Sequence, residues 1–353
     1  MLLLATGLRQ RGWQVTVIAL TGTGGQSAVD LPAAGISFLS LHMRKGLADP
    51  RGWLRFHRWL RQHRPDVVHA HLPHAAWLAR WSSLALPGLS FPKPVLIDTL
   101  HSGSTGTLGR RLGYRFSAWI PHRVTAVSHA VAEAHLAAGM VYPKTLLVLP
   151  NGVDTDRWRP SPEIRAAVRA SLGLDDAFLW LASGRLEPVK DYTTLLWAMA
   201  QAPPTAQLAL AGNGSLEAEL RHLARRLHLE RRVHFLGFVP DVLRWMQAAD
   251  GFVLSSHWEG LPMALLEAAS CALPVVASDL PSVREIVDDG HTGQLTPSGD
   301  SAAFARALAE VMNTPSAERS AMGQRARQSV IARYSLESVL DRWEALFYSL
   351  MRG

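Results

Sequence analysis

The chain of 353 residues is longer than one hydrophobic core usually serves, so we expect two domains. With 48% hydrophobic and 18% charged residues, the composition excludes a disordered, collagen-like or coiled-coil protein. A single cysteine, Cys271, excludes an intramolecular disulfide and a cysteine-built zinc site, and it favours a reducing compartment. We expect neither a spanning helix, which needs about 20 apolar residues, nor a signal peptide.

The net charge of +7 is concentrated in the first half of the chain. Residues 1–160 hold 18 Lys and Arg against 7 Asp and Glu, whereas the remainder holds 18 against 22. A basic half predicts an anionic partner, either nucleic acid or an anionic membrane surface. The alternative explanation is that the gene comes from a GC-rich genome, in which arginine codons are frequent. Nucleic acid is disfavoured because the basic half has no RNP, helix-turn-helix or zinc motif.

Short apolar runs alternate with helical segments through the first half. Residues 1–11 predict a helix that ends at Gly12. Strands are expected at residues 15–19, 36–39, 67–70, 95–99, 124–127 and 146–149. This alternation is typical of βαβ units, and the scarcity of polar residues in the runs predicts parallel sheets covered on both faces.

The beginning of the chain departs from this pattern because a helix precedes any strand. In a doubly wound sheet of strand order 3-2-1-4-5 the first strand is central, so its absence leaves two neighbours with unpaired backbone groups. We therefore expect a strand and a glycine turn upstream of Met1, unless another segment fills the gap.

The second half repeats the alternation after residues 151–162, a segment rich in Asn, Gly, Asp and Pro. Strands are expected at residues 178–183, 207–211, 233–236, 251–254 and 274–277, with helical periodicity over 216–228 and 263–271. We expect one domain at residues 1–156 and another at 157–353, whose terminal helix can pack back on the first. Ligands of such folds bind at the carboxyl ends of the strands.

The strongest chemical signal is the segment SGRLEPVKD at residues 183–191, directly after an expected strand. The planar guanidinium group of Arg185 can donate paired hydrogen bonds, and the ammonium group of Lys190 adds a compact positive charge. Together they can neutralise a diphosphate without a metal. An exposed turn with two solvated charges is the alternative.

A second signal is the segment SSHWEGLP at residues 255–262, which leads from a strand into a helix that contains Glu267. Pro262 fits the first helical turn, whose free amides can face a phosphate. Glu267 lies among apolar residues, where a carboxylate needs a partner such as the vicinal hydroxyls of a ribose. A capping glutamate and a buried salt bridge are the alternative for Glu259 and Glu267.

Three histidines of the first half, His69, His71 and His101, lie at the ends of expected strands. A histidine can polarise or hydrogen-bond a substrate hydroxyl near neutral pH, although each is also explained as a structural residue. No spacing places three metal ligands together.

These motifs resemble glycosyltransferase family 4, retaining nucleotide-sugar transferases of the α/β GT-B fold, which has two doubly wound Rossmann-like domains facing a central cleft. The likeness covers nearly the whole chain, and the E-x7-E spacing combined with the GR-x4-K turn is its specific part. It is also carried by residues 12–17, 66–71, 99–101, 124–128, 150–154, 236–238 and 274–278.

The resemblance implies a role for each matching residue. Arg185 and Lys190 would hold the donor diphosphate, Glu267 the ribose and Glu259 the hydroxyls of the donor sugar. The remaining matches are Gly260 and Leu261 near the phosphates, Gly237 and Phe238 beside the base, and His101 beside the reacting sugar. The family usually needs no bound metal, so neither a metal nor a cofactor is implied. Its opening strand and double-glycine loop have no counterpart here.

The sequence thus predicts a cytoplasmic hexosyltransferase that moves a sugar from a nucleotide diphosphate, with a UDP-sugar favoured, to a glycan or lipid-linked acceptor in cell-envelope polysaccharide synthesis. A GT-B nucleotide-sugar epimerase and a degenerate, non-catalytic binding partner are the alternatives. Residues 109–123 interleave arginines with Phe116 and Trp119, the pattern of an amphipathic segment on the inner face of the plasma membrane. Residues 51–64 are a second such segment, and an ordinary surface helix is the alternative for both.

Overall fold

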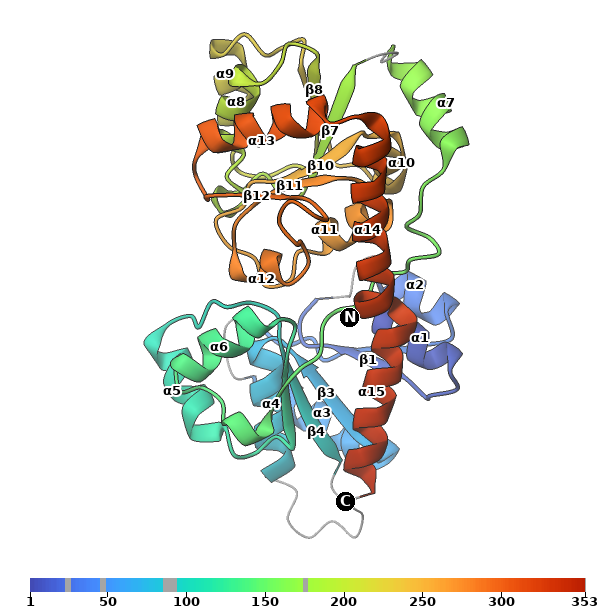
Figure 1. Cartoon of the computed structure of the whole chain (residues 1–353). Coiled ribbons are helices and arrows are strands. Elements are labelled where there is room, and N and C mark those ends of the chain that lie inside the picture. The colour runs from blue at the N-terminus through green and yellow to red at the C-terminus, as the bar shows by residue number, and fades with distance from the viewer. Residues whose placement is uncertain (23–26, 45–48, 85–93, 174–176, 353) are drawn as a thin grey trace. The chain divides into compact units, whose positions relative to one another are not determined.

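The computed structural model describes residues 1–22, 27–44, 49–84, 94–173 and 177–352, and it divides into two compact units (Figure 1). Unit 1 comprises Met1–Gly152 with Leu336–Gly353, and unit 2 comprises Val153–Ser335. The division therefore falls four residues before the one expected after residue 156. Its position follows from pairing, because the Val153 N–H donates to the Tyr334 carbonyl at 2.9 Å within unit 2.

Unit 1 begins with helix α1 (Leu2–Gln10), which confirms the expected helix at residues 1–11. The parallel strands β1 (Thr16–Ala19) and β2 (Ser37–Ser40) follow, joined by α2 (Ser27–Ala33). These two strands form a sheet of their own.

The rest of unit 1 is built on a four-stranded parallel sheet of order β3-β4-β5-β6. Its strands are β3 (Val67–His71), β4 (Val95–Leu100), β5 (Arg123–Ala126) and β6 (Leu146–Val148). Its helices are α3 (Pro50–His63), α4 (Pro73–Leu84), α5 (Leu108–Ser117), α6 (His129–Ala137) and the short η1 (Pro143–Thr145). The side chains of Asp49, Thr107 and Ser128 cap α3, α5 and α6 by accepting backbone N–H bonds of the first turn.

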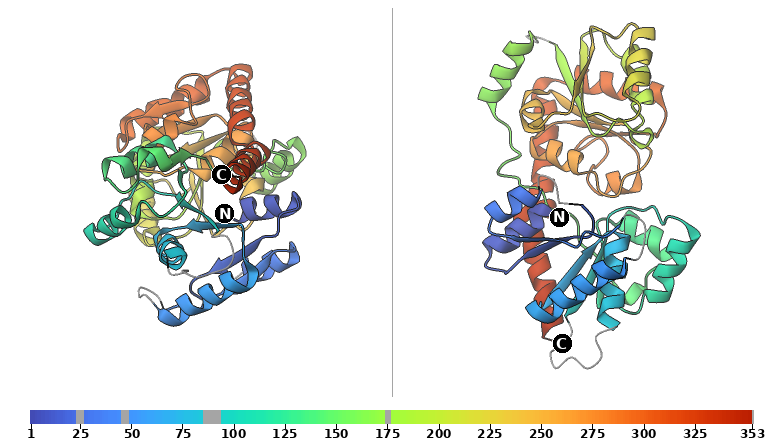
Figure 2. Two further views of the ribbon diagram at one scale, coloured as in Figure 1. Left: turned by 90° about the horizontal axis from the view of Figure 1, so that it is seen from below. Right: turned by 180° about the vertical axis from the view of Figure 1, so that it is seen from behind.

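The last helix, α15 (Leu336–Met351), belongs to unit 1, although its residues fall within the range 157–353 expected for the second domain. Its buried Trp343 and Phe347 pack in one cluster with Leu8 of α1 and Ile97 of β4. Arg11 forms ion pairs with Asp341 and Glu344, both at 2.6 Å. The helix therefore covers one face of unit 1, in front of the strands in Figure 1 and behind them in the right panel of Figure 2.

A gap divides the strands of unit 1. Within the described residues, no strand pairs with β1 on the side away from β2, or with β3 on the side away from β4. No described segment therefore fills the place expected for a first strand.

Unit 2 has a six-stranded parallel sheet of order β12-β11-β10-β7-β8-β9. Its strands are β7 (Phe178–Ser183), β8 (Ala206–Ala211), β9 (Val233–Gly237), β10 (Gly251–Leu254), β11 (Val275–Ser278) and β12 (Gln294–Thr296). Five of these confirm expected strands, and β12 was missed because its three residues include polar Gln294 and Thr296.

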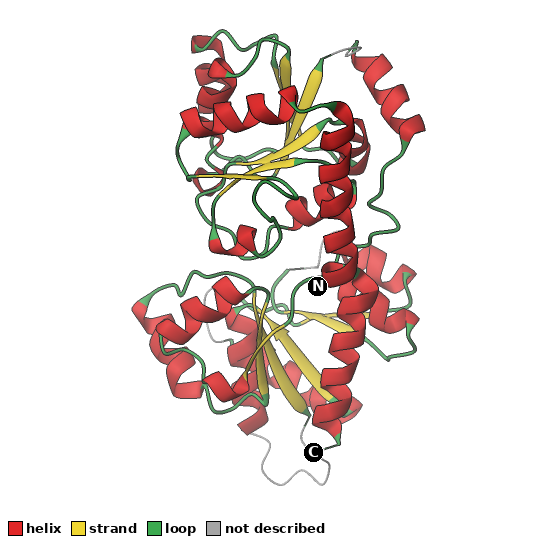
Figure 3. Ribbon diagram, viewed as in Figure 1, coloured by secondary structure: helices red, strands yellow, loops and turns green. Residues whose placement is uncertain are grey.

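Helices lie on both faces of this sheet (Figure 3). They are α7 (Pro162–Leu172), η2 (Pro188–Lys190), α8 (Tyr192–Gln201), α9 (Glu217–Arg226), α10 (Val242–Ala248), α11 (Met263–Ser270), α12 (Pro281–Arg284), α13 (Ser301–Asn313) and α14 (Ser316–Tyr334). One large cluster packs α8, α9 and α13 against β7 and β8, and it includes the fully buried Trp180. The strand order reverses between β7 and β10, so the carboxyl ends of these two strands form the topological switch point of the sheet.

Candidate functional site

The two sequence motifs of unit 2 meet at this switch point. Residues 183–191 follow β7, residues 255–262 follow β10, and the two strands are paired neighbours. The Ser255 hydroxyl donates to the Lys190 carbonyl at 2.8 Å, and the His257 N–H donates to the Val189 carbonyl at 2.8 Å. These bonds join the two loops, so the charged residues of both motifs share one site.

Lys190 and Glu259 form an ion pair with 2.6 Å between Nζ and Oε1, and their side chains are only 20% and 12% exposed. The hydroxyl of fully buried Ser256 donates to the same carboxylate oxygen at 2.7 Å. The sequence predicted both charged residues but neither this contact nor Ser256. The signal for Ser256 was its place three residues before Glu259, within reach of that side chain.

Arg185 is the exposed member of the site. Among the described residues its guanidinium makes no side-chain hydrogen bond or ion pair, whereas the neighbouring Glu187 accepts bonds from the N–H and hydroxyl of Ser215. The pKa of Glu187 is lowered, chiefly by these bonds. Arg185 therefore keeps a charged donor free for a ligand at the carboxyl end of β7.

Close backbone packing shapes the floor of the site. A Cβ on Gly212 would lie 2.0 Å from the Gly184 carbonyl oxygen, and one on Gly214 would lie 2.4 Å from the Leu186 carbonyl oxygen. The Leu186 N–H also donates to the Asn213 carbonyl at 3.0 Å. The loop after β8 thus requires glycine at two positions to support the loop after β7. The sequence analysis missed it, although G-N-G directly after a strand is a recognisable signal of close backbone approach.

Glu267 lies on α11, partly buried between apolar neighbours. Burial raises its pKa to about 7, and the nearby positive charge of Arg157 opposes that rise. Within the described part of the chain, its carboxylate has no hydrogen-bond partner. A partly buried carboxylate without a hydrogen-bond partner is suited to accept hydrogen bonds from a ligand.

The other expected donor contacts lie at the same edge of the sheet. Gly237 ends β9 with a φ of +66°, which favours glycine, and Phe238 after it is 73% exposed. Gly260 and Leu261 are buried between Glu259 and the start of α11. The structure thus places the predicted residues of unit 2 in the loops that follow β7, β9 and β10, except for Glu267, which lies on α11.

The remaining predicted residue, His101, lies in unit 1 and directly follows β4. Its Nε2 lies 2.8 Å from Nδ1 of His71, at the end of β3. His69 Nε2 lies 2.6 Å from the Thr99 hydroxyl, which in turn lies 2.7 Å from the Thr125 hydroxyl. The sequence placed these histidines at strand ends but did not predict the His71–His101 contact.

Burial keeps the histidine cluster neutral. It lowers the pKa of His69 to about 3 and that of His101 to about 4, and it lowers the pKa of His71 further. A neutral His101 carries one N–H and one acceptor nitrogen. Because Nε2 is engaged with His71, its Nδ1 is the nitrogen left to meet a ligand hydroxyl.

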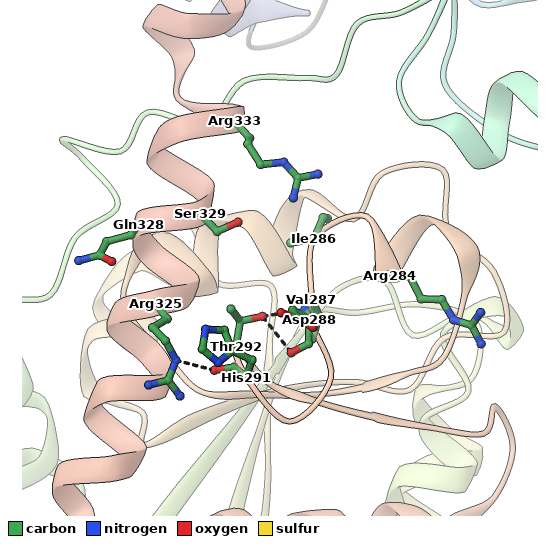
Figure 4. A pocket seen from close by; sticks show the side chains of 10 residues that line it. All are labelled: Arg284, Ile286, Val287, Asp288, His291, Thr292, Arg325, Gln328, Ser329 and Arg333. Carbon is green, nitrogen blue, oxygen red and sulfur yellow. Dashed lines mark hydrogen bonds between the residues drawn. The ribbon is translucent and has the colours of Figure 1, made fainter.

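Unit 2 also has a pocket of about 480 Å³ between the loop at residues 284–292 and α14 (Figure 4). Arg284, Arg325 and Arg333 line it, but Arg284 is paired with Asp279, and Arg325 and Arg333 donate to backbone carbonyls. None of the predicted site residues lies there. In the described residues no three His, Cys, Asp or Glu side chains form a metal-binding group, and no helix is long and apolar enough to span a membrane.

The chain belongs to the family 4 glycosyltransferases, a group of transferase enzymes with the GT-B fold. The family model for "Glycosyltransferase Family 4" matches residues 1–157, and that for "Glycosyl transferases group 1" matches residues 165–329. Glycosyltransferase EpsD of Bacillus subtilis is 30% identical over 97% of this chain and 91% of its own length.

More distant relatives agree with this assignment. The chain is 26% identical to UDP-Gal:alpha-D-GlcNAc-diphosphoundecaprenol alpha-1,3-galactosyltransferase of Escherichia coli, over 86% of this chain and 81% of that protein. The structure of Anabaena Alr3699/HepE in complex with UDP superposes with a TM-score of 0.86 at 23% identity, covering 98% of this chain and 94% of that one. The protein is thus a glycosyltransferase of polysaccharide or glycoconjugate synthesis.

Proposed function

We propose that this enzyme transfers a sugar from a nucleotide diphosphate sugar, with a UDP-sugar as the favoured donor, to a glycan or lipid-linked acceptor of the cell envelope, with retention at the anomeric carbon. The observation that carries the proposal is the ion pair of Lys190 with Glu259 where the loops after β7 and β10 are joined, at the switch point of the unit 2 sheet. The loop after β7 also carries Arg185, and the helix that follows Glu259 carries Glu267, so two cations are available for a diphosphate and two carboxylates for hydroxyl groups.

The Lys190–Glu259 pair has a part in donor binding. Without a ligand, each charge neutralises the other in a partly buried place. When the donor binds, its diphosphate accepts hydrogen bonds from the ammonium group of Lys190 and from the guanidinium group of Arg185. The Glu259 carboxylate then accepts hydrogen bonds from sugar hydroxyls. As the glycosidic bond breaks, negative charge grows on the diphosphate, so the two cations stabilise the transition state more than the bound donor.

Glu267 serves as the acceptor for the two ribose hydroxyls. Its partly buried carboxylate has a raised pKa because water is excluded, and two hydroxyl donors favour its ionised form. Donor affinity should therefore fall as the pH drops below about 7, where the free enzyme must first lose a proton from Glu267. The backbone amides of Gly260 and Leu261 would add contacts to phosphate oxygens, and Gly237 and Phe238 would border the base.

In unit 1, His101 is the residue proposed to meet the transferred sugar. The bond to His71 orients the imidazole ring, and burial keeps it uncharged, so His101 acts as a neutral hydrogen-bonding group. His71 is then a positioning residue. The same-face departure of the diphosphate and attack of the acceptor need no protein nucleophile.

A panel of nucleotide sugars with product analysis tests the proposal. Transfer of sugar to an acceptor, with the anomeric configuration of the donor kept, is the expected result. Release of free epimerised sugar and nucleotide would identify the epimerase instead. Nucleotide binding without turnover of any donor would identify the non-catalytic binding partner.

We further propose that helix α5 attaches the enzyme to the inner face of the plasma membrane. Leu108, Leu112 and Phe116, four residues apart on one face, are 69%, 43% and 70% exposed, and Trp119 just after the helix is 62% exposed. Arg111 and Arg115 are exposed beside them. The second expected segment, on α3, differs because its Phe56 and Leu60 are buried in the core.

Co-sedimentation with vesicles tests this attachment. We expect binding to anionic but not zwitterionic vesicles, weakened by high salt and by replacing Arg110, Arg111 and Arg115 with Glu. The same charge change at three exposed arginines of unit 2, Arg225, Arg226 and Arg231, is the matched control. Equal loss of binding in both triple variants, or none in the α5 variant, would remove α5 as the anchor.

A further inference from the structure

The pocket of about 480 Å³ in unit 2 is formed by two parts of the chain (Figure 4). One is the loop at residues 284–292, and the other is a face of α14 that carries Arg325, Gln328, Ser329 and Arg333. The volume falls within the range of about 300–1,000 Å³ that is usual for ligand pockets. None of the residues proposed to bind the donor lines it. A molecule bound here would therefore be a second ligand of unit 2.

The loop at residues 284–292 is held in place by its own contacts. The Thr292 N–H donates to the Asp288 carbonyl at 2.9 Å, and the Thr292 hydroxyl accepts the bond of the Asp288 N–H at 2.8 Å. Ile286 and Val287, only 5% and 4% exposed, fasten the beginning of the loop to the core of unit 2. The wall of the pocket is therefore formed without a ligand, so binding would not have to order it.

Two arginines of α14 join the helix to this loop with only some of their hydrogen-bond donors. Arg325 donates through Nε to the His291 carbonyl at 2.9 Å, and Arg333 donates through Nη2 to the Glu285 carbonyl at 2.6 Å. An arginine side chain has five N–H donors. Within the described residues, Nη1 and Nη2 of Arg325 and Nε and Nη1 of Arg333 make no hydrogen bond, and neither side chain forms an ion pair. Both guanidinium groups therefore keep charged donors for a ligand.

The charge of the pocket lining is positive but mixed. Arg284 is a third cation of the lining, yet its guanidinium group is neutralised by both carboxylate oxygens of Asp279, at 2.5 and 2.6 Å. In the described part of the chain, Asp288 is the only carboxylate that lines the pocket, because the neighbouring Glu285 and Asp289 do not line it. Two cations without a carboxylate partner therefore face one carboxylate. This lining favours a ligand that is an anion and that also donates hydrogen bonds.

The two cations lie apart along α14. The helix rises by roughly 12 Å between Arg325 and Arg333. In Figure 4 their guanidinium groups lie toward opposite ends of the pocket, and Ser329 lies between them. A ligand that meets both cations therefore needs two separate acidic groups. Among the described residues, the side chains of Gln328, Ser329 and His291 have no hydrogen-bond partner, so they can bind hydroxyl groups that lie between the acidic groups.

We propose that this pocket binds an acidic oligosaccharide that carries carboxylates on separate sugar rings. Arg325 binds one carboxylate through its two terminal nitrogens, which is the two-point contact that a guanidinium group makes with a carboxylate, and Arg333 binds another. Asp288 accepts hydrogen bonds from ring hydroxyls, which gives a carboxylate a role in a basic pocket. The pocket would thus hold a charged glycan apart from the donor site. This inference goes beyond the proposed function, and its test measures binding without turnover.

Titration calorimetry of the 353-residue chain with three probes tests the ligand class. The probes are hexagalacturonate, which has a carboxylate on each ring, the neutral maltohexaose, and inorganic phosphate. We expect one molecule of hexagalacturonate to bind at least tenfold more tightly than either of the other probes. No binding of hexagalacturonate, equal binding of maltohexaose or equal binding of phosphate would overturn the proposal. The titration is repeated with UDP present, and competition by UDP would also overturn the proposal, since it would place the oligosaccharide at the donor site.

Two variants test whether the oligosaccharide binds in this pocket. Arg325→Gln combined with Arg333→Gln removes the two cations, whereas Ser329→Trp keeps them and fills the space between them. Each variant should bind hexagalacturonate at least tenfold more weakly than the parent. Arg306→Gln, at an exposed arginine of α13 outside the pocket, is the matched control and should bind like the parent.

Slow amide exchange in β8 shows for each variant that unit 2 is folded. Ser329→Trp keeps the contacts between α14 and the loop, so it remains a test if the double arginine variant unfolds. Parental affinity in a folded pocket variant, or an equal loss of affinity in Arg306→Gln, would overturn the proposal.

Discussion

Replacing Glu267 with glutamine should stabilise unit 2 at neutral pH but not at acid pH. Burial raises the pKa of Glu267 from 4.5 to about 7, so the folded protein holds this proton more tightly than the unfolded chain does. The stability that the protonated group contributes is complete below pH 4.5 and is lost as the pH rises through about 7. Since one pKa unit corresponds to about 1.4 kcal/mol, the loss is on the order of 3 kcal/mol.

Amide exchange of Ala206–Ala211 in β8 reports the opening free energy of unit 2. At pH 8 the Glu267→Gln variant should exceed the parent by up to roughly 3 kcal/mol, and at pH 4 the two should be close. Glu219→Gln, at an exposed glutamate of α9, is the matched control. A difference that does not change with pH, or a variant less stable than the parent at pH 8, would refute the reasoning. Adding UDP at pH 8 should stabilise the parent more than the variant, since the parent has the ribose acceptor.

The other predictions concern the reaction. Arg185→Ala and Lys190→Ala should each slow donor turnover by tens- to hundreds-fold, because each removes a charge-assisted contact worth roughly 1.5–3 kcal/mol; full activity of the double variant would contradict the diphosphate site. Glu267→Gln should weaken UDP binding in titration calorimetry, whereas Glu259→Gln should keep it and lose sugar-dependent turnover; parental UDP affinity in both would contradict the ribose role. His101→Ala should lower kcat far more than donor affinity, and a parental kcat in steady-state kinetics would make this histidine structural.

Much of the fold followed from local pattern. Apolar runs four to six residues long gave eleven of the strands within one or two residues of their ends, because strands covered on both faces leave little room for polar side chains. The pattern did not find β12, whose three residues carry no such run. The pattern also did not decide which unit α15 packs against. The periodicity of a helix indicates its apolar face, but it does not indicate the surface that this face contacts.

The site divides in the same way. Residue type and position after a strand predicted Arg185, Lys190 and Glu259, since the carboxyl ends of parallel strands gather at one edge of a sheet. Glu267 was predicted from its place among apolar residues of a helix. The pairing of Lys190 with Glu259 was not predictable, because it depends on β7 and β10 being neighbours although 67 residues lie between the two strands in sequence.

The sequence by itself determined that the chain folds as two parallel α/β units, and it determined the chemistry of the loops at their strand ends. Only the tertiary structure decided the bond between His71 and His101 and the pairing of Lys190 with Glu259, and it showed how far burial raises the pKa of Glu267. The physical reason is that strand periodicity is a local property, determined by neighbouring residues. Pairing and burial depend on segments that are distant in sequence and meet only when the chain is folded.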